Sequence, residues 1–263
     1  MGAAKLISPK RPWQEQAVRL IPYIIGLGFL FILPNFLPSF LQNLAIKILI
    51  YAIFAMSLDL ILGYTGLFSM GHAAFFGVGG YTAGIMMVKY GVTSFWIVAP
   101  MSILMSGVIA ALFGYIALRV KGLRFLMVTL ALGQLLFSLT SQWMDMTGGH
   151  YGLRGIPLPN LGIPGFSFDM IQARPLYYFV LVFFIISFFL LRRIIHSPFG
   201  QALQGIREDE PRMKALGYNT WLYKYLAFII TGMFAGLAGL LFAQWNLLIS
   251  PMHVGFVMST SAV

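Results

Sequence analysis

The chain has 263 residues, of which 59% are hydrophobic and only 9% are charged, with a formal net charge of +10 and no cysteine. Soluble domains average roughly 45 to 50% apolar and about 25% charged residues, so this composition excludes an ordinary water-soluble protein and indicates one embedded in a lipid bilayer. The absence of cysteine excludes disulfides, thiolate metal sites and a cysteine nucleophile. The basic residues are scattered over short loops, so nucleic acid is not expected as a partner.

Seven apolar runs are each about as long as a helix that crosses a hydrocarbon core of about 30 Å. These runs are residues 20–37, 41–62, 71–88, 94–118, 125–140, 176–191 and 225–245. They are continuous rather than alternating with a period of two, which favours helices over barrel strands. We therefore expect an all-α integral membrane protein, a polytopic bundle of about seven transmembrane helices in a single domain over residues 1–263.

The distribution of Lys and Arg predicts the orientation of these spans. With residues 1–19 inside, thirteen basic residues lie in cytoplasmic segments, three lie outside and Lys47 lies within a span. This asymmetry is what the positive-inside rule predicts. The basic N-terminal segment carries no cleavable signal pattern, so we expect it to be retained in the cytoplasm. The cytoplasmic side then also holds residues 192–224, and the outside holds residues 141–175 and 246–263.

The second predicted span carries two charged residues, Lys47 and Asp59. They are twelve residues apart, so at about 100° per residue they face directions roughly 120° apart and do not form a same-face pair. Both lie near an end of the span, and either side chain can reach the interface. The alternative is that Asp59 lines a polar path across the membrane.

The stretch GYTGLFSMGHAAFFGVGGYTAG, residues 63–84, is dense in glycine. Its small residues recur at four-residue spacing, which permits close helix packing, and such a segment can also unwind where its backbone lines a cavity. A histidine here is more typical of a hydrogen-bonded structural residue than of a ligand or proton carrier. The candidate path residues are Asp59, Ser69, Gly71, His72, Gly77 and Gly80.

Two further segments carry predictions. Residues 141–175 are rich in Gly and Pro, which predicts an ordered external cap of short turns, either packing material or a surface that receives a ligand or an external protein. The seventh predicted span carries a G-x-x-x-G pattern and further small residues, which predict tight packing against another helix. The packing residues are Gly232, Ala235, Gly236 and Gly239.

The 197–219 segment concentrates charge between two apolar runs. Ser197-Pro198 favours a helix start, and Asp209 followed by Glu210-Pro211 favours a second start, with Gly217 as its stop. Apolar residues at positions 199, 203 and 206 form a stripe on the first short helix. Because such a stripe should not be left in water, we expect this segment to dock a soluble partner.

The pattern G-x-A-L-x-x-I-R-E-D-E followed by K-A-L-G-Y-N resembles the cytoplasmic coupling loop of permease subunits of ATP-binding-cassette importers for branched-chain amino acids. The 63–84 stretch resembles the glycine-rich membrane segment of that family. TGGHYGLRGIP resembles its external loop, and TGMFAGLAGLLFAQ with the following SP matches a later span. The likeness is greatest to the larger of the two paired permeases, and similar permeases carry urea or short amides.

This resemblance implies a multi-pass subunit of the bacterial plasma (inner) membrane that translocates branched-chain amino acids without being an enzyme itself. It implies four partners: a second permease, two cytoplasmic ATPase subunits and an external substrate-binding protein. Neither a cofactor nor a metal is expected. The residues expected to couple to the ATPases are Phe199, Gly200, Ala202, Leu203, Ile206, Arg207, Glu208, Asp209, Glu210 and Gly217. Phe199, Leu203 and Ile206 are expected to seat in an ATPase groove, and Arg207, Glu208 and Asp209 to orient the loop.

The chain departs from the family pattern at two places. Asp59 stands where an uncharged polar residue, usually asparagine, is expected. Family members also continue past the position of Val263 with further spans, so the sequence is expected to be a truncated one.

Other functional classes have weaker support. A phosphate-binding G-x-x-x-x-G-K-[ST] motif does not occur in the sequence, so energy from ATP must enter by contact. A urea or short-amide importer of the same type is the main alternative. An ion-coupled secondary transporter would rely on Asp59, Lys47 and His72. An intramembrane enzyme would need a nucleophile with a placed base, and Ser69, His72 and His150 form no convincing set.

Overall fold

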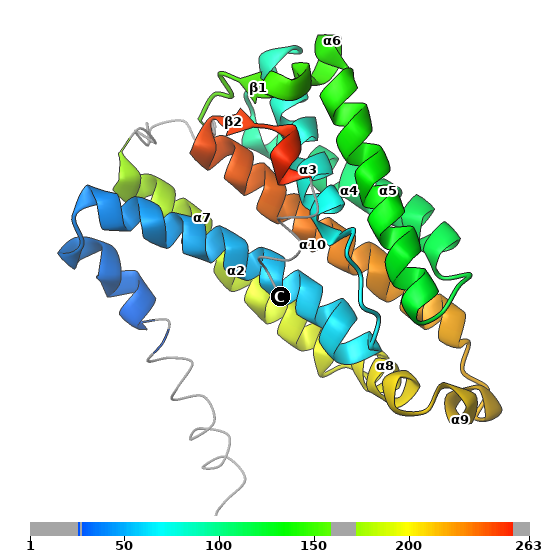
Figure 1. The fold of residues 1–263 in the computed structure, drawn as a ribbon. Helices are drawn as coiled ribbons and strands as arrows, with labels where there is room; N and C mark the ends of the chain where they lie inside the picture. The colour runs from blue at the N-terminus through cyan, green and yellow to red at the C-terminus, as the bar shows by residue number, and fades with distance from the viewer. Residues whose placement is uncertain (1–25, 27, 159–171, 255–263) are drawn as a thin grey trace, which may run out of the picture.

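The computed structural model describes residues 26, 28–158 and 172–254, most of which are helical (Figure 1). Within this part of the chain, five helices are long and apolar enough to cross a membrane, and a sixth apolar helix, α3, is shorter. The five are α2 (Ser39–Thr65), α4 (Phe95–Ala117), α5 (Leu123–Gln142), α7 (Ala173–Ile195) and α10 (Thr220–Asn246), and α3 spans His72–Val88. These six helices correspond to six predicted spans.

The first predicted span lies partly outside the described residues. Residues 28–36 are helical, but 20–25 and 27 are not described, so a total of seven spans stays a prediction. The helices that flank the 197–219 segment are longer than predicted, since α7 continues to Ile195 and α10 already begins at Thr220. Arg192 and Arg193 fit the last turn of α7 because cations are favourable at a helix C-terminus.

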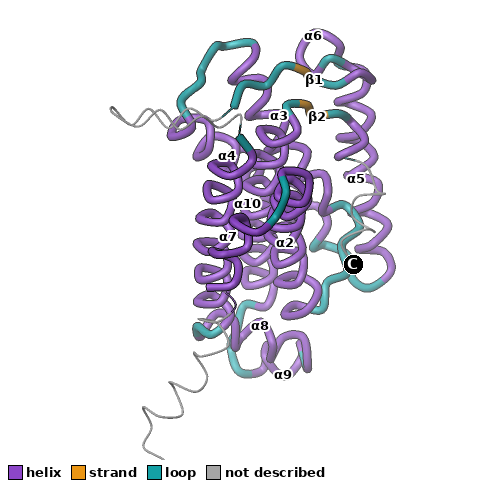
Figure 2. The backbone as a smooth tube through the Cα atoms, turned by 90° about the vertical axis from the view of Figure 1, so that its left-hand side faces the viewer, coloured by secondary structure: helices purple, strands orange, loops and turns teal. Residues whose placement is uncertain are grey.

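Helix α10 forms the centre of the bundle and packs against α2, α3 and α4, while α7 packs against α2 (Figure 2). Small residues make the close approach possible. A Cβ added at Gly236 would overlap Ser106 of α4, and one added at Gly239 would overlap the carbonyl oxygen of Phe76 in α3. The four predicted packing residues, Gly232, Ala235, Gly236 and Gly239, are all buried.

The chain between α2 and α3 runs back into the bundle as non-helical backbone, residues 66–71. Gly66 ends α2 with φ of 69°, a conformation that favours glycine. His72, the first residue of α3, is level with Ser57 of α2, since His72 Nε2 and Ser57 Oγ lie 2.9 Å apart in a buried hydrogen bond. Ser57 lies eight residues before the end of α2, about 12 Å along the helix axis, which explains why α3 is short.

The two ends of the bundle differ in construction (Figure 2). At one end, β1 (Leu153–Arg154) pairs antiparallel with β2 (Leu248–Ile249), beside the short helices α6 (Met144–Thr147), η1 (Gly149–Tyr151) and η2 (Pro251–His253). The described part of the predicted external cap thus consists of short turns and helical pieces, and residues 159–171 lie outside the described part. At the other end lie α8 (Pro198–Glu208) and α9 (Glu210–Ala215).

Candidate functional site

Two capped short helices make up the 197–219 segment, as the sequence predicts. Ser197 precedes α8, and its hydroxyl accepts a hydrogen bond from the backbone N–H of Gly200 at 3.4 Å. Asp209 separates α8 from α9, and its carboxylate accepts from the backbone N–H of Arg212 at 3.0 Å. Both helices carry Pro in the first turn, where no backbone N–H is needed.

The segment ends in a left-handed turn at Gly217, whose φ is 89°. The N–H of Gly217 donates to the carbonyl of Lys214 at 3.0 Å, and that of Tyr218 donates to the carbonyl of Met213 at 3.1 Å. This pair of bonds is a Schellman motif, and it satisfies carbonyls that the end of α9 would otherwise leave unpaired. The chain then turns into α10, which Asn219 caps.

The apolar stripe of α8 is covered by the chain itself. The buried residues of this helix are Gly200, Ala202, Leu203 and Ile206. They face the ends of α2, α7 and α10, and Phe199, which is half-buried, stacks on Tyr223 of α10 at 5.5 Å between ring centroids. The prediction that Leu203 and Ile206 seat in a partner's groove is therefore wrong. The apolar ends of α2, α7 and α10 cover the stripe, so no separate partner is needed to keep it from water.

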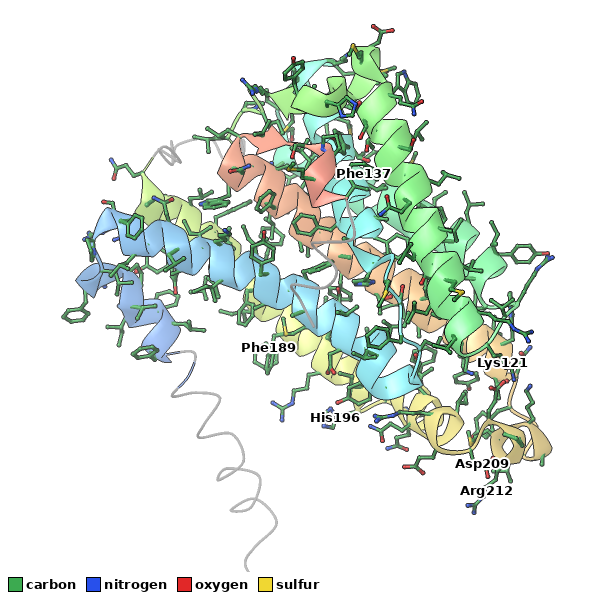
Figure 3. All side chains as sticks on the ribbon, viewed as in Figure 1. Lys121, Phe137, Phe189, His196, Asp209 and Arg212 are labelled. Atoms are coloured by element: carbon green, nitrogen blue, oxygen red, sulfur yellow. The ribbon has the colours of Figure 1, made fainter. Side chains whose placement is uncertain are left out.

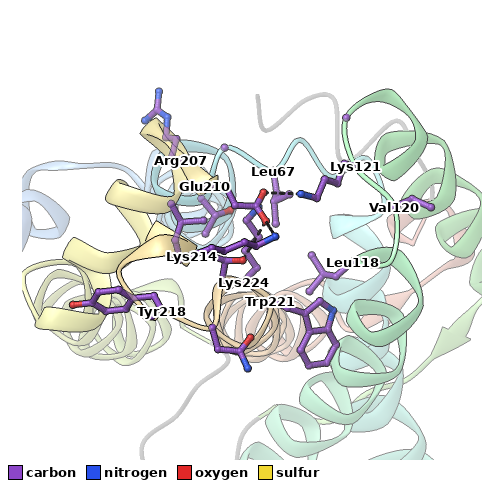
Figure 4. A pocket seen from close by; sticks show the side chains of 17 residues that line it. Leu67, Leu118, Val120, Lys121, Arg207, Glu210, Lys214, Tyr218, Trp221 and Lys224 are labelled. Carbon is purple, nitrogen blue, oxygen red and sulfur yellow. Dashed lines mark hydrogen bonds and ion pairs between the residues drawn. The ribbon is translucent and has the colours of Figure 1, made fainter. Parts of the chain in front are cut away.

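Glu210 is the centre of an ion cluster that joins three parts of the chain (Figure 4). Its carboxylate lies 2.9 Å from Nζ of Lys224 in α10, and 3.1 Å from Nζ of both Lys214 in α9 and Lys121 in the α4–α5 connection. It also accepts a hydrogen bond from the hydroxyl of Thr220 at 3.1 Å. The cluster lines an open hollow of about 630 Å³ at this end of the bundle.

The charge state of Glu210 follows from these partners. Burial by itself raises the pKa of its carboxyl, but the hydrogen bonds from Lys224, Lys214 and Lys121 and the charge of Lys224 outweigh burial and lower the pKa from 4.5 to about 2. Glu210 is thus ionised at any physiological pH. One carboxylate holds three ammonium groups, so α9, α10 and the α4–α5 connection are tied at a single point.

Arg207 and Asp59 both lie near the end of α2 that packs against α8. The guanidinium of Arg207 donates to the backbone carbonyl of Gly63, in the last turn of α2. Asp59 is exposed and lines a hollow together with Arg207 and Glu208. Arg207 is therefore held by this chain, and Asp209 serves as a helix cap, whereas Glu208 is exposed.

What the 197–219 segment presents outward is mainly α9, which has no buried residue. Leu216, just after its end, is 66% exposed and Tyr218 is 42% exposed. Arg212 and Asp209 lie at the outer edge, on the same end of the bundle as Lys121 (Figure 3). The exposed surface therefore combines apolar and charged side chains. The apolar stripe at positions 199, 203 and 206 did not predict this surface.

Most of the candidate path residues are buried inside the chain. Ser69, Gly71, His72, Gly77 and Gly80 are buried, and only Asp59 is exposed. Glycine is required at several of these positions because other backbone or side-chain atoms occupy the space of a Cβ: the carbonyl of Thr129 at Gly71, Val254 at Gly77 and Ile249 at Gly80. A role of these residues in a pathway stays a prediction.

The candidate ion-binding residues Asp59, Lys47 and His72 have separate surroundings. Lys47 is exposed and lies over the ring of Tyr51 at 5.8 Å, twelve residues away from Asp59 along α2. His72 packs against the rings of Phe54 and Phe75. Among the described residues, no group of three or more His, Asp or Glu side chains lies close enough to hold a metal ion.

Comparison with known proteins adds independent information. Residues 40–263 match the family model described as the permease component of the branched-chain amino acid transport system. The high-affinity branched-chain amino acid transport system permease protein LivM of Escherichia coli (strain K12) is 31% identical over 82% of this chain and 55% of its own length. LivM of Salmonella typhimurium has the same identity and coverage.

A second kind of permease is also similar. The permease protein LivH of Escherichia coli (strain K12) is 25% identical over 81% of this chain and 72% of its own length. The chain spans about half the length of the LivM proteins that it matches. No solved structure gives a significant match.

Proposed function

The chain belongs to the family of permease components of branched-chain amino acid transport systems, and from this premise we propose that it is one of two membrane-spanning subunits of an ATP-binding-cassette importer. The imported substrate is a branched-chain amino acid, delivered by an external binding protein, and ATP is hydrolysed by two cytoplasmic subunits. Similarity to both LivM and LivH supports pairing with a second, related permease.

The observation that carries this proposal is the geometry of the 197–219 segment. It projects from one end of the bundle, is anchored on both sides by long apolar helices, and exposes α9 with Leu216 and Tyr218. Arg119, Lys121 and Arg124 lie in or beside the connection that shares this end, which supports a cytoplasmic location. We assign α9 and the turn after it, residues 210–218, as the ATPase contact, and α8 as its mount on the bundle.

Movement of α9 then reaches the membrane through Glu210. Its carboxylate is bonded to Lys224 near the start of α10 and to Lys121 in the connection just before α5, so a displacement of α9 pulls on two spans at once. Buried Leu203 and Ile206 make α8 move with α2, α7 and α10. In this mechanism ATP binding rotates the bundle between outward-open and inward-open forms as a packed unit.

The test uses the chain assembled with its partner subunits and loaded binding protein in membrane vesicles. Leu216→Ala should weaken association with the ATPases roughly tenfold, because loss of a well-packed interface side chain costs about 1 to 2 kcal/mol, and should lower ATP-driven uptake accordingly. Gln201→Ala, an exposed substitution on α8, is the matched control. Equal association and uptake for the two variants would overturn the assignment of α9.

The substrate is tested separately. Uptake of labelled leucine should be competed by isoleucine and valine and not by urea. If urea or a short amide competes and the branched-chain amino acids do not, the complex is instead a urea or short-amide importer of the same type.

A further inference from the structure

Helix α5 has one side buried in the bundle and one side exposed. The buried residues are Phe125, Thr129, Gly133, Leu136 and Ser141. One of its contacts is with the non-helical segment 66–71: Met70 N–H donates to Thr129 Oγ1 at 3.3 Å, and Gly71 lies against the backbone of Thr129 and Gly133. Figure 1 shows α5 along one edge of the bundle, away from α2 and α7.

The exposed side of α5 is divided into a polar stripe and an apolar stripe. Gln134, Ser138 and Gln142 recur every four residues and are all exposed, and Gln142 Nε2 donates to Ser138 Oγ at 3.1 Å. Leu135 follows Gln134 and Leu139 follows Ser138, so each leucine points about 100° around the helix from the polar stripe. Their side chains are 57% and 48% exposed. The polar stripe is therefore a distinct surface on one helix.

Gln134 lies at a depth in the membrane where an exposed polar side chain needs an explanation. Gln134 lies eleven residues after Leu123, about 16 Å along the helix and close to the middle of a 30 Å hydrocarbon layer. Its amide forms no hydrogen bond with another described residue. A primary amide without partners in hydrocarbon costs several kcal/mol, so this side chain is not expected to face lipid tails.

The inference rests on the proposed function and deepens it. We propose that the polar stripe of α5, Gln134, Ser138 and Gln142, lines a water-containing amino acid pathway between this chain and the second permease. Because this chain is similar to both LivM and LivH, we expect the second permease to share its fold and to place the corresponding helix opposite α5, about a local two-fold axis. Such an arrangement hydrates the stripe and leaves Leu135 and Leu139 for apolar contact.

The chemistry of the stripe suits a zwitterionic substrate. Each glutamine amide offers a carbonyl oxygen for an ammonium group and an N–H donor for a carboxylate, and the serine hydroxyl does both. None of the three carries a charge, so the pathway holds the amino acid without trapping it, which rapid passage requires. The stripe runs from the middle of the bundle to the end with β1 and β2, the predicted entry side.

The test exploits the lack of cysteine in the native chain. Single variants Gln134→Cys, Ser138→Cys and Leu139→Cys are assembled with cysteine-free partner subunits and treated with a charged methanethiosulfonate reagent. Gln134→Cys and Ser138→Cys should react at least tenfold faster than Leu139→Cys, and labelling should block leucine uptake. Reaction at equal rates in all three variants, or no reaction at positions 134 and 138, would overturn the proposal.

A second measurement separates this inference from the proposed function. Gln134→Leu should lower the maximal rate of leucine uptake several-fold, while stimulation of ATP hydrolysis by loaded binding protein persists. If the unsubstituted complex couples ATP to leucine uptake but positions 134 and 138 are inaccessible, the pathway assignment fails and the proposed function stands. If the unsubstituted complex shows no ATP-dependent uptake, both fail.

Discussion

Helices α10 and α5 are both long apolar helices of one bundle, but they are held in opposite ways. Every residue of α10 from Ala235 to Gln244 is buried, whereas α5 buries only scattered positions and meets the rest of the bundle at a few places. The difference shows that apolar length alone does not specify a helix's role. Small residues let α10 pack closely against α3 and α4, whereas α5 keeps exposed polar residues along one side.

The largest expected effect is that of a substitution in α10, at the centre of the bundle. Gly239→Leu would drive a side chain into the carbonyl of Phe76, and overpacking of this kind costs roughly 3 kcal/mol or more where backbone cannot move. We expect loss of monodisperse protein in detergent. Ala131→Leu, on the exposed side of α5, is the control and should give a normal yield. Equal yields of the two variants would contradict the contrast between the helices.

A smaller effect is expected where α5 contacts the non-helical segment 66–71. A Cβ at Gly71 would overlap the carbonyl of Thr129, so Gly71→Ala should destabilise the bundle by about 1 to 3 kcal/mol. Because the strain lies between α5 and residues 66–71, hydrogen exchange should increase in α5 and remain unchanged in the middle of α10. A uniform increase in both helices would show that α5 is not held separately.

The attachment of the α4–α5 connection to α9 depends on pH through Glu210. Its pKa is lowered in the folded state to about 2, so its ion pairs contribute stability that is complete above the ordinary value of 4.5 and is lost as the pH falls from there through about 2. Glu210→Gln should remove about 1 kcal/mol at pH 7. The unfolding temperature in detergent should depend less on pH between 5 and 3 in the variant than in the native chain.

An identical pH profile for native protein and Glu210→Gln would contradict the role of the cluster. Glu208→Gln is the matched control, since Glu208 is exposed and takes part in no salt bridge among the described residues.

The smallest effect concerns α9 alone. Asp209→Ala removes the cap of a short exposed helix and should cost about 0.5 to 1 kcal/mol. Faster proteolysis within residues 210–218 reports this change without a shift in the global unfolding temperature. Glu208→Ala changes the neighbouring residue without removing a cap and should be proteolysed at the native rate.

Local features of the 197–219 segment could be predicted from the sequence because they depend on neighbouring residues. Ser197 before Pro198, Asp209 before Glu210-Pro211, and Gly217 after Lys214 each satisfy backbone groups within one turn. The apolar runs likewise predicted six helices, since hydrophobic length is the strongest signal of a membrane span.

Features that depend on distant residues could not be predicted. The stripe with Leu203 and Ile206 shows which side of α8 is apolar, but not which surface covers it. Lys121 is 89 residues from Glu210, and no local pattern links them. The polar stripe of α5 does have a sequence signal, because Gln134, Ser138 and Gln142 follow helical spacing, whereas the path prediction rests on glycine and charge in residues 59–80.

The central position of α10 also constrains biogenesis. Its partners α2, α3 and α4 all precede it in the sequence, so they leave the ribosome before the helix that fills the space between them. Until α10 is inserted, Gly79 and Gly80 of α3 lack the α10 backbone that packs against them, and β1 lacks the strand β2 that pairs with it. We therefore expect the contacts of α2, α3 and α4 with α10, and the β1–β2 pair, to form only after this late helix is inserted.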